Sequence, residues 1–121
     1  GLGAPLMRAM FPRAFLDVNR EPYELDPAMF ADRLPAYVNA RSIRVAGGLG
    51  TIARVVADAE EIYREPLSVE EGLSRIEGLY KPYHAALRSR LTATLDRFPF
   101  AVLVDCHSMP STARGLEHRA R

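Results

Sequence analysis

The chain has 121 residues, of which 16 are basic and 15 are acidic, so its formal net charge is +1 at pH 7. A charge this close to balance gives no electrostatic reason to expect nucleic acid or an anionic membrane surface as a partner. No apolar run is long enough to span a bilayer, and the hydrophobic content of 48% predicts one packed domain. Cys106 has no partner for an internal disulfide, which favours a cytoplasmic protein.

The N-terminal half of the chain predicts short elements joined by turns. Residues 1–11 are apolar and indicate the tail of a helix, and residues 14–18 predict a short strand. Three prolines fall within residues 22–42, so we expect an ordered loop there with at most a helical turn near residues 27–30. A second short strand is predicted over residues 43–46.

A long helix is predicted to follow Ser68. Ser68 and Glu71 form a capping box, in which the serine hydroxyl accepts a hydrogen bond from the Glu71 amide. Pro82 removes one hydrogen bond of the helix, so a kink is expected near residues 78–81. The helix is expected to end at the Phe98-Pro99 pair, and spacings of three and four define its core-facing stripe: Leu73, Ile76, Tyr80, Tyr83, Leu87, Leu91 and Leu95.

The segment after this helix carries the strongest chemical signal. Residues 101–104 are apolar and predict a buried strand, which leads into Asp105 and His107. A long helix that leads into a buried strand favours an α/β fold, in which ligands bind at the carboxyl ends of the strands. Asp105 and His107 would share one face, whereas Cys106 would point to the opposite face as a small core residue. His107 is then a candidate metal ligand or general base, and the alternative is a histidine held by a backbone carbonyl.

A second group of polar residues suits a carboxylate ligand. Arg13, Asn19 and Arg20 lie close together in the sequence, at the end of the strand predicted for residues 14–18. An arginine presents a fork of N–H donors that matches a carboxylate with two parallel hydrogen bonds. The alternative is that Arg20 pairs with Glu21 or Glu24 at the surface and that Asn19 only caps a turn.

Other candidate motifs carry less chemistry. The glycine-rich segment 47–50 contributes to a Gly48-x-Gly50-x-x-Ala53 pattern that resembles a dinucleotide-binding fingerprint. The pattern lacks the acidic strand end required about twenty residues later, so the alternative is a glycine-rich turn that borders a site through Arg54. His84 is expected at the surface or at the edge of the core, and His118 receives no role.

Four blocks of this sequence, taken together, resemble the N-formylglutamate amidohydrolase family. That family is itself similar to the wider group of zinc carboxypeptidases and aspartoacylases, whose Asp-x-Asn-Arg segment matches residues 17–20. The blocks occur in the order of the family: residues 11–22, 46–54, 80–84 and 104–111.

The resemblance implies a zinc hydrolase with a phosphorylase/hydrolase-like α/β fold, a mixed sheet flanked by helices. It implies that Asn19 and Arg20 bind a substrate carboxylate, and that Arg13 contacts the reacting acyl oxygen or a second carboxylate. It also implies that His107 is a zinc ligand. Carboxylates often orient an imidazole that binds a metal, so we expect Asp105, on the same face, to orient His107. The zinc ion would lower the pKa of a bound water to about 7 and polarise the amide carbonyl.

The other two zinc ligands and the general-base glutamate of the family are not found in this sequence. We therefore expect residues 1–121 to be a partial domain, the central portion of an enzyme that is inactive as this segment alone. The predicted reaction is hydrolysis of N-formyl-L-glutamate to formate and L-glutamate, and the partner is a small N-acyl amino acid. Two alternatives stay open: a related N-acyl-amino-acid hydrolase or carboxypeptidase, and a non-catalytic domain that binds a carboxylate or a nucleotide.

Overall fold

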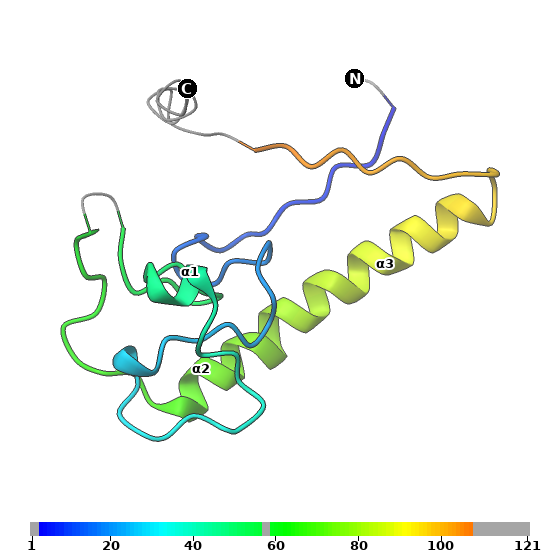
Figure 1. The fold of residues 1–121 in the computed structure, drawn as a ribbon. Helices are drawn as coiled ribbons and strands as arrows, with labels where there is room; N and C mark the ends of the chain where they lie inside the picture. The colour runs from blue at the N-terminus through cyan, green and yellow to red at the C-terminus, as the bar shows by residue number, and fades with distance from the viewer. Residues whose placement is uncertain (1–2, 57–58, 108–121) are drawn as a thin grey trace, which may run out of the picture. The chain divides into compact units, whose positions relative to one another are not determined.

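The computed structural model of the protein describes residues 3–56 and 59–107. The chain divides into two compact units, with the boundary between Arg90 and Leu91. Among the described residues, no helix has both the length and the apolar character that crossing a membrane requires. The helical elements, shown in Figure 1, are the 3₁₀ turn η1 (Pro27–Met29), α1 (Ile43–Ala46), α2 (Val69–Arg75), the π-helical turn η3 (Ile76–Tyr80) and α3 (Lys81–Leu95).

The predicted long helix is confirmed as the continuous run α2–η3–α3, residues 69–95. Its start is the predicted cap, because the Ser68 hydroxyl accepts a hydrogen bond of 3.1 Å from the Glu71 amide. Glu70 and Glu71 lie in the first turn, where negative charge is favourable next to the helix dipole. The ordered loop over residues 22–42 is also confirmed, with its one helical turn, η1, at the expected place.

The irregularity expected beside Pro82 takes the form of a π-helical turn. The Lys81 amide donates to the Ile76 carbonyl, five residues back instead of four. Pro82 follows directly and has no N–H of its own to donate. Because of the wider turn, the helix continues through Pro82 instead of ending there. The same turn determines which side chains of α3 share a face with those of α2.

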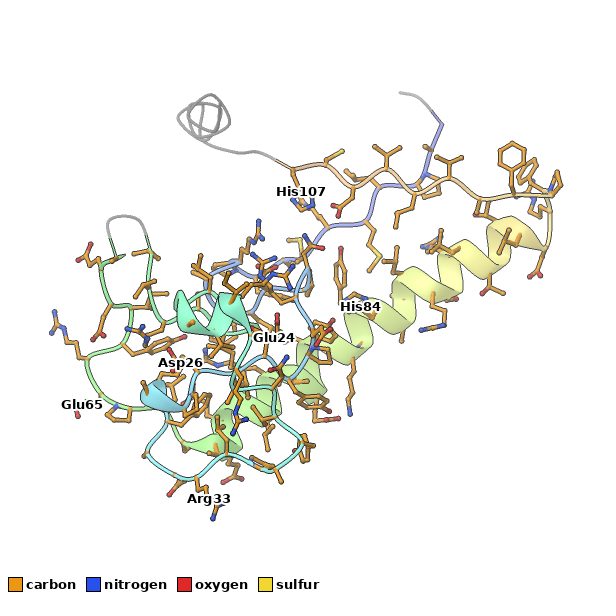
Figure 2. All side chains as sticks on the ribbon, viewed as in Figure 1. Glu24, Asp26, Arg33, Glu65, His84 and His107 are labelled. Carbon is orange, nitrogen blue, oxygen red and sulfur yellow. The ribbon has the colours of Figure 1, made fainter. Side chains whose placement is uncertain are left out.

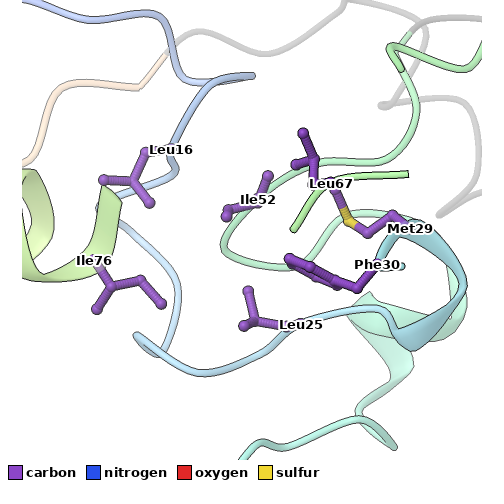
Figure 3. Packing of buried hydrophobic residues seen from close by; sticks show 7 residues of the cluster. All are labelled: Leu16, Leu25, Met29, Phe30, Ile52, Leu67 and Ile76. Atoms are coloured by element: carbon purple, nitrogen blue, oxygen red, sulfur yellow. The ribbon is translucent and has the colours of Figure 1, made fainter. Parts of the chain in front are cut away.

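The core of the first unit is formed largely by loops that pack against the long helix. Only Met29 and Ile76 of the buried cluster lie in helical elements. Residues 29–31 are tied to Leu67 by two backbone hydrogen bonds of 2.9 Å, which form an isolated parallel bridge. Burial of apolar side chains therefore orders a backbone that has little regular structure of its own. The cluster, seen in Figure 3, contains Leu16, Leu25, Met29, Phe30, Ile52, Leu67 and Ile76.

The predicted strand over residues 14–18 is wrong, because this segment is a turn. The amides of Phe15 and Leu16 both donate to the Pro12 carbonyl, at 3.0 and 3.3 Å. Proline fixes its own φ at a value suited to the start of a turn, and here the chain turns directly after it. The helix tail expected over residues 1–11 is also wrong, since residues 3–11 contain no helix.

The predicted strand over residues 43–46 is wrong as well, because these residues form helix α1. The Ser42 hydroxyl accepts a hydrogen bond of 3.1 Å from the Val45 amide, which is the bond of a helix N-cap. The apolar alternation of a four-residue segment fits a strand or one helical turn equally well, and the cap decides between them.

In the second unit, the burial predicted for residues 101–104 is wrong. Val102 is 74% exposed and Val104 is 75% exposed, and residues 101–104 have no strand partner among residues 3–56 and 59–107. An apolar strand becomes buried only when neighbouring strands and a covering layer are present. In the described part of the chain, β-pairing is limited to isolated bridges, so the α/β class stays a prediction.

Candidate functional site

The carboxylate of Asp17 is the centre of the turn that carries the predicted substrate-binding residues. Its Oδ2 atom lies 2.8 Å from Nε of Arg13 and 3.7 Å from Nε of Arg20. Its Oδ1 atom accepts a hydrogen bond of 2.9 Å from the Asn19 amide. The structure thus brings Arg13, Asn19 and Arg20 together, as expected, around a buried acid to which sequence reasoning had given no role. We call residues 12–20 the Asp17 loop.

Arg20 is the more restrained of the two arginines, with a side chain that is 19% exposed against 55% for Arg13. Its Nε donates to the Leu49 carbonyl at 3.2 Å, and its Nη1 donates to the Asn19 carbonyl at 3.3 Å. Its Nη2 has no hydrogen-bond partner among the described residues. The alternative in which Arg20 pairs with Glu21 or Glu24 is not what the structure shows, because its acidic partner is Asp17.

The long helix holds the backbone of the Asp17 loop from one side. Tyr80 donates from its hydroxyl to the Arg20 carbonyl at 2.6 Å, and Nε2 of His84 lies 2.8 Å from the Val18 carbonyl. A carbonyl oxygen can only accept, so Nε2 of His84 carries the hydrogen and has no lone pair left for a metal ion. His84, labelled in Figure 2, is therefore a half-buried structural donor at the core edge, and the expectation of a core-edge histidine is confirmed.

Burial raises the pKa of the Tyr80 hydroxyl, and the carboxylates of Glu21 and Asp17 raise it further. Each of these influences disfavours the phenolate. The hydroxyl therefore keeps its proton, and with it the hydrogen bond to the Arg20 carbonyl, over the whole neutral pH range. Sequence reasoning placed Tyr80 in the apolar stripe of the helix and missed this donor.

Arg75 supports the same loop from the previous turns of the helix. It is buried, and its Nη1 donates to the Phe15 carbonyl at 3.3 Å and to the Tyr63 hydroxyl at 2.8 Å. Its guanidinium lies over the Phe15 ring, 3.9 Å from the ring centroid, and pairs with Glu71. Burial alone would lower the pKa of Arg75, but hydrogen bonds with Glu71 and Tyr63 outweigh it and the net shift is upward. Arg75 therefore stays charged.

The glycine-rich segment 47–50 is followed by Thr51, which holds the backbone of the Asp17 loop by a hydrogen bond. The Thr51 carbonyl accepts a hydrogen bond of 2.7 Å from the Asp17 amide, and the Thr51 amide donates to the Glu24 carbonyl at 2.8 Å. A Cβ atom on Gly50 would lie 2.3 Å from that same carbonyl oxygen, so only glycine fits. The glycine therefore serves close backbone packing. The dinucleotide fingerprint is not met, because it requires a preceding strand and α1 stands there instead.

Arg54, the other candidate in this segment, is occupied by acids of its own chain. Its Nε lies 2.7 Å from Asp26 and its Nη1 lies 3.0 Å from Glu61. Its pKa is raised, first by the hydrogen bond to Asp26. With two carboxylate partners in place, Arg54 has no surplus charge to offer an anionic ligand.

In the second unit, Asp105 and His107 form a pair. Nε2 of His107 lies 2.9 Å from Oδ2 of Asp105, which confirms that the two side chains share one side of the backbone. Both are exposed to solvent, and so is Cys106, for which a core position had been predicted wrongly. Among residues 3–56 and 59–107, no three His, Cys, Asp or Glu side chains gather as a metal site. His118 lies outside the described residues.

The geometry thus gathers the predicted carboxylate-binding residues on one loop, which the long helix holds in place. The family model of N-formylglutamate amidohydrolase matches residues 1–121. The chain belongs to that family, which confirms the resemblance.

Similar proteins agree with this assignment. The N-formylglutamate deformylase of Pseudomonas putida is 30% identical over 112 residues, and that of Pseudomonas aeruginosa is 28% identical over 112 residues. Each alignment covers 91% of this chain and 36% of the relative. The crystal structure of N-formylglutamate amidohydrolase from Ralstonia eutropha JMP134 is similar with a TM-score of 0.79 and 34% identity, over 93% of this chain and 40% of that chain. The chain thus spans well under half the length of these relatives.

Proposed function

We propose that the protein hydrolyses N-formyl-L-glutamate to formate and L-glutamate, with zinc as its metal. Family membership supports this reaction, and the relatives from both Pseudomonas species carry the name N-formylglutamate deformylase. The observation that carries the proposal is the arrangement of Arg13, Asn19 and Arg20 around Asp17. It supplies fixed donors for a ligand that is rich in carboxylates.

Charge balance explains why this loop suits such a ligand. Two guanidiniums share the single carboxylate of Asp17, so the loop has a surplus of positive charge. A substrate carboxylate restores the balance and pairs with Nη2 of Arg20, which the described residues leave without a partner. Arg20 is already held through Nε and Nη1, so little side-chain freedom is lost when the substrate binds. Arg13 is more exposed and adapts to the acyl end or to a second carboxylate.

The Asp105–His107 pair fits one position of a zinc site. Histidines that bind a metal commonly have one ring nitrogen hydrogen-bonded to a carboxylate, and Nε2 of His107 has such a contact with Asp105. We propose that His107 is a zinc ligand and that Asp105 orients it. When bound, zinc would polarise the formyl carbonyl and lower the pKa of a bound water to about 7. A catalytic zinc site normally has three protein ligands, so we expect the other two, and the general-base glutamate, elsewhere in the protein.

The test is metal analysis and a substrate panel on the full-length protein. We expect one zinc per chain and fastest hydrolysis of N-formyl-L-glutamate, with slower turnover of N-acetyl-L-glutamate and of peptides that end in glutamate. N-formyl-L-glutamine is the matched control, because it differs only in the side-chain carboxylate. Zinc-loaded protein that hydrolyses none of these amides but binds L-glutamate would favour the non-catalytic carboxylate-binding domain. A preference for peptides would favour a carboxypeptidase.

A further inference from the structure

The carbonyl groups on either side of Asn19 are bound by side chains of the long helix. The Val18 carbonyl accepts a hydrogen bond from His84, and the Arg20 carbonyl accepts one from Tyr80. Backbone carbonyls in regular structure are normally satisfied by backbone amides. Here the orientation of two peptide groups, those that follow Val18 and Arg20, depends on two side chains of one helix. These two side chains are four residues apart and therefore lie on one helix face.

The ring of His84 is itself fixed in orientation. It stacks on Tyr80 with centroids 4.3 Å apart and an angle of 36° between the rings, and Tyr83 meets its edge with centroids 5.5 Å apart. The ring donates from Nε2, because the Val18 carbonyl can only accept. His84 therefore supplies a donor of constant position to the turn.

The π-helical turn changes which side chains of the long helix face the Asp17 loop. Tyr80 is its last residue, and His84 follows one helical turn later. One residue of a helix corresponds to a rotation of about 100°, so the extra residue of a π turn changes which side chains of α3 share a face with α2. Arg75 before the turn, Tyr80 at its end and His84 after it all reach carbonyls of the Asp17 loop.

We propose that His84, together with Tyr80, is a positioning residue for carboxylate recognition. By holding the peptide groups around Asn19, it sets the direction of the Arg20 side chain without touching the substrate. This inference rests on the proposed function. It predicts that loss of the His84 donor weakens substrate binding while the bond-breaking step is preserved.

The experiment compares His84→Gln with His84→Asn in the full-length protein. Both variants offer an amide N–H, but only glutamine is long enough to place it where Nε2 of histidine lies. We expect KM for N-formyl-L-glutamate to rise about three- to tenfold in His84→Asn, the effect of one lost hydrogen bond, with kcat within twofold of wild type. His84→Gln is expected to restore KM to within about twofold. Tyr80→Phe is expected to raise KM similarly, and Arg88→Gln, an exposed position one turn further along α3, is the control.

A second readout does not depend on activity. Hydrogen exchange of the Asn19 and Arg20 amides, which donate within the loop to Asp17, is expected to become faster in His84→Asn than in His84→Gln. Unchanged KM and unchanged exchange in His84→Asn would overturn the proposal, and so would a fall in kcat with KM preserved. If the wild-type protein hydrolyses no N-formyl-L-glutamate, the proposed function fails. Exchange at the two amides then decides the positioning role alone, and Tyr80→Phe decides it if His84→Asn does not fold.

Discussion

Two glycines of the long helix predict opposite responses to the same substitution. A Cβ atom on Gly72 would lie 2.6 Å from the nearest ring carbon of Phe30, whereas one on Gly78 would meet nothing within 4 Å. Alanine stabilises a helix interior over glycine by about 1 kcal/mol, which applies at both positions. At Gly72 the ring of Phe30 is buried in the core and must shift, and overpacking of this kind costs about 1–3 kcal/mol.

We therefore expect Gly78→Ala to stabilise the protein by about 0.5–1 kcal/mol and Gly72→Ala to destabilise it by up to about 2 kcal/mol. Urea unfolding of the two variants beside wild type, with equal m-values, measures the difference directly. The comparison cancels the helix-propensity gain and leaves the contact between α2 and Phe30. If Gly72→Ala stabilised the protein as much as Gly78→Ala, the packing of Phe30 against α2 would be refuted. The account of the core as loops packed against the long helix would then be refuted as well.

Three further predictions address the site. The pKa of Tyr80 in the folded state is raised above its ordinary value of 10.0, so the folded state holds the hydroxyl proton more tightly than the unfolded state does. The contribution of Tyr80 to the free energy of unfolding is therefore complete below pH 10 and falls as the pH rises beyond it. Unfolding between pH 8 and 11 should show a steeper loss for wild type than for Tyr80→Phe. Arg20→Lys keeps the charge but loses the fork, and kinetics should show a loss in kcat/KM equivalent to about 2–5 kcal/mol. His107→Ala should remove stoichiometric zinc, and Asp105→Asn should weaken zinc affinity about 10- to 100-fold in metal titrations.

The start and most of the length of the long helix could be predicted from the sequence, because its signals are local. The helix ends at Leu95 and not at the expected Phe98-Pro99 pair, and Leu95, which was assigned to the core-facing stripe, is 53% exposed. The Ser68–Glu71 cap, the apolar stripe and the effect of Pro82 each depend on residues within one or two turns. The short elements could not. Residues 43–46 fit a strand or a helical turn equally well, and residues 14–18 adopt a turn because Pro12 accepts two hydrogen bonds. The burial predicted for residues 101–104 was wrong because burial of a strand requires neighbouring strands, which a local apolar pattern does not specify.

The candidate site shows the same division. Arg13, Asn19 and Arg20 could be grouped from the sequence, and the signal for Asp17 was present in its spacing of four and three residues from the two arginines. The supporting residues could not be found this way. Tyr80 fits the apolar stripe of its helix, and its donor role becomes visible only through a hydrogen bond to a residue 60 positions away.

The structure gives a physical reason why two separate blocks of the family resemblance occur together. The block over residues 11–22 is an irregular loop, and an irregular backbone keeps a single conformation only if its polar groups are satisfied and its entropy loss is offset by packing. The block over residues 80–84 supplies two of the required donors from a rigid helix. A change in either block therefore alters the demand on the other, and the effects of Tyr80→Phe and His84→Asn on Arg20 should be coupled rather than additive. The carboxylate binding that we propose therefore depends on the loop and the helix jointly.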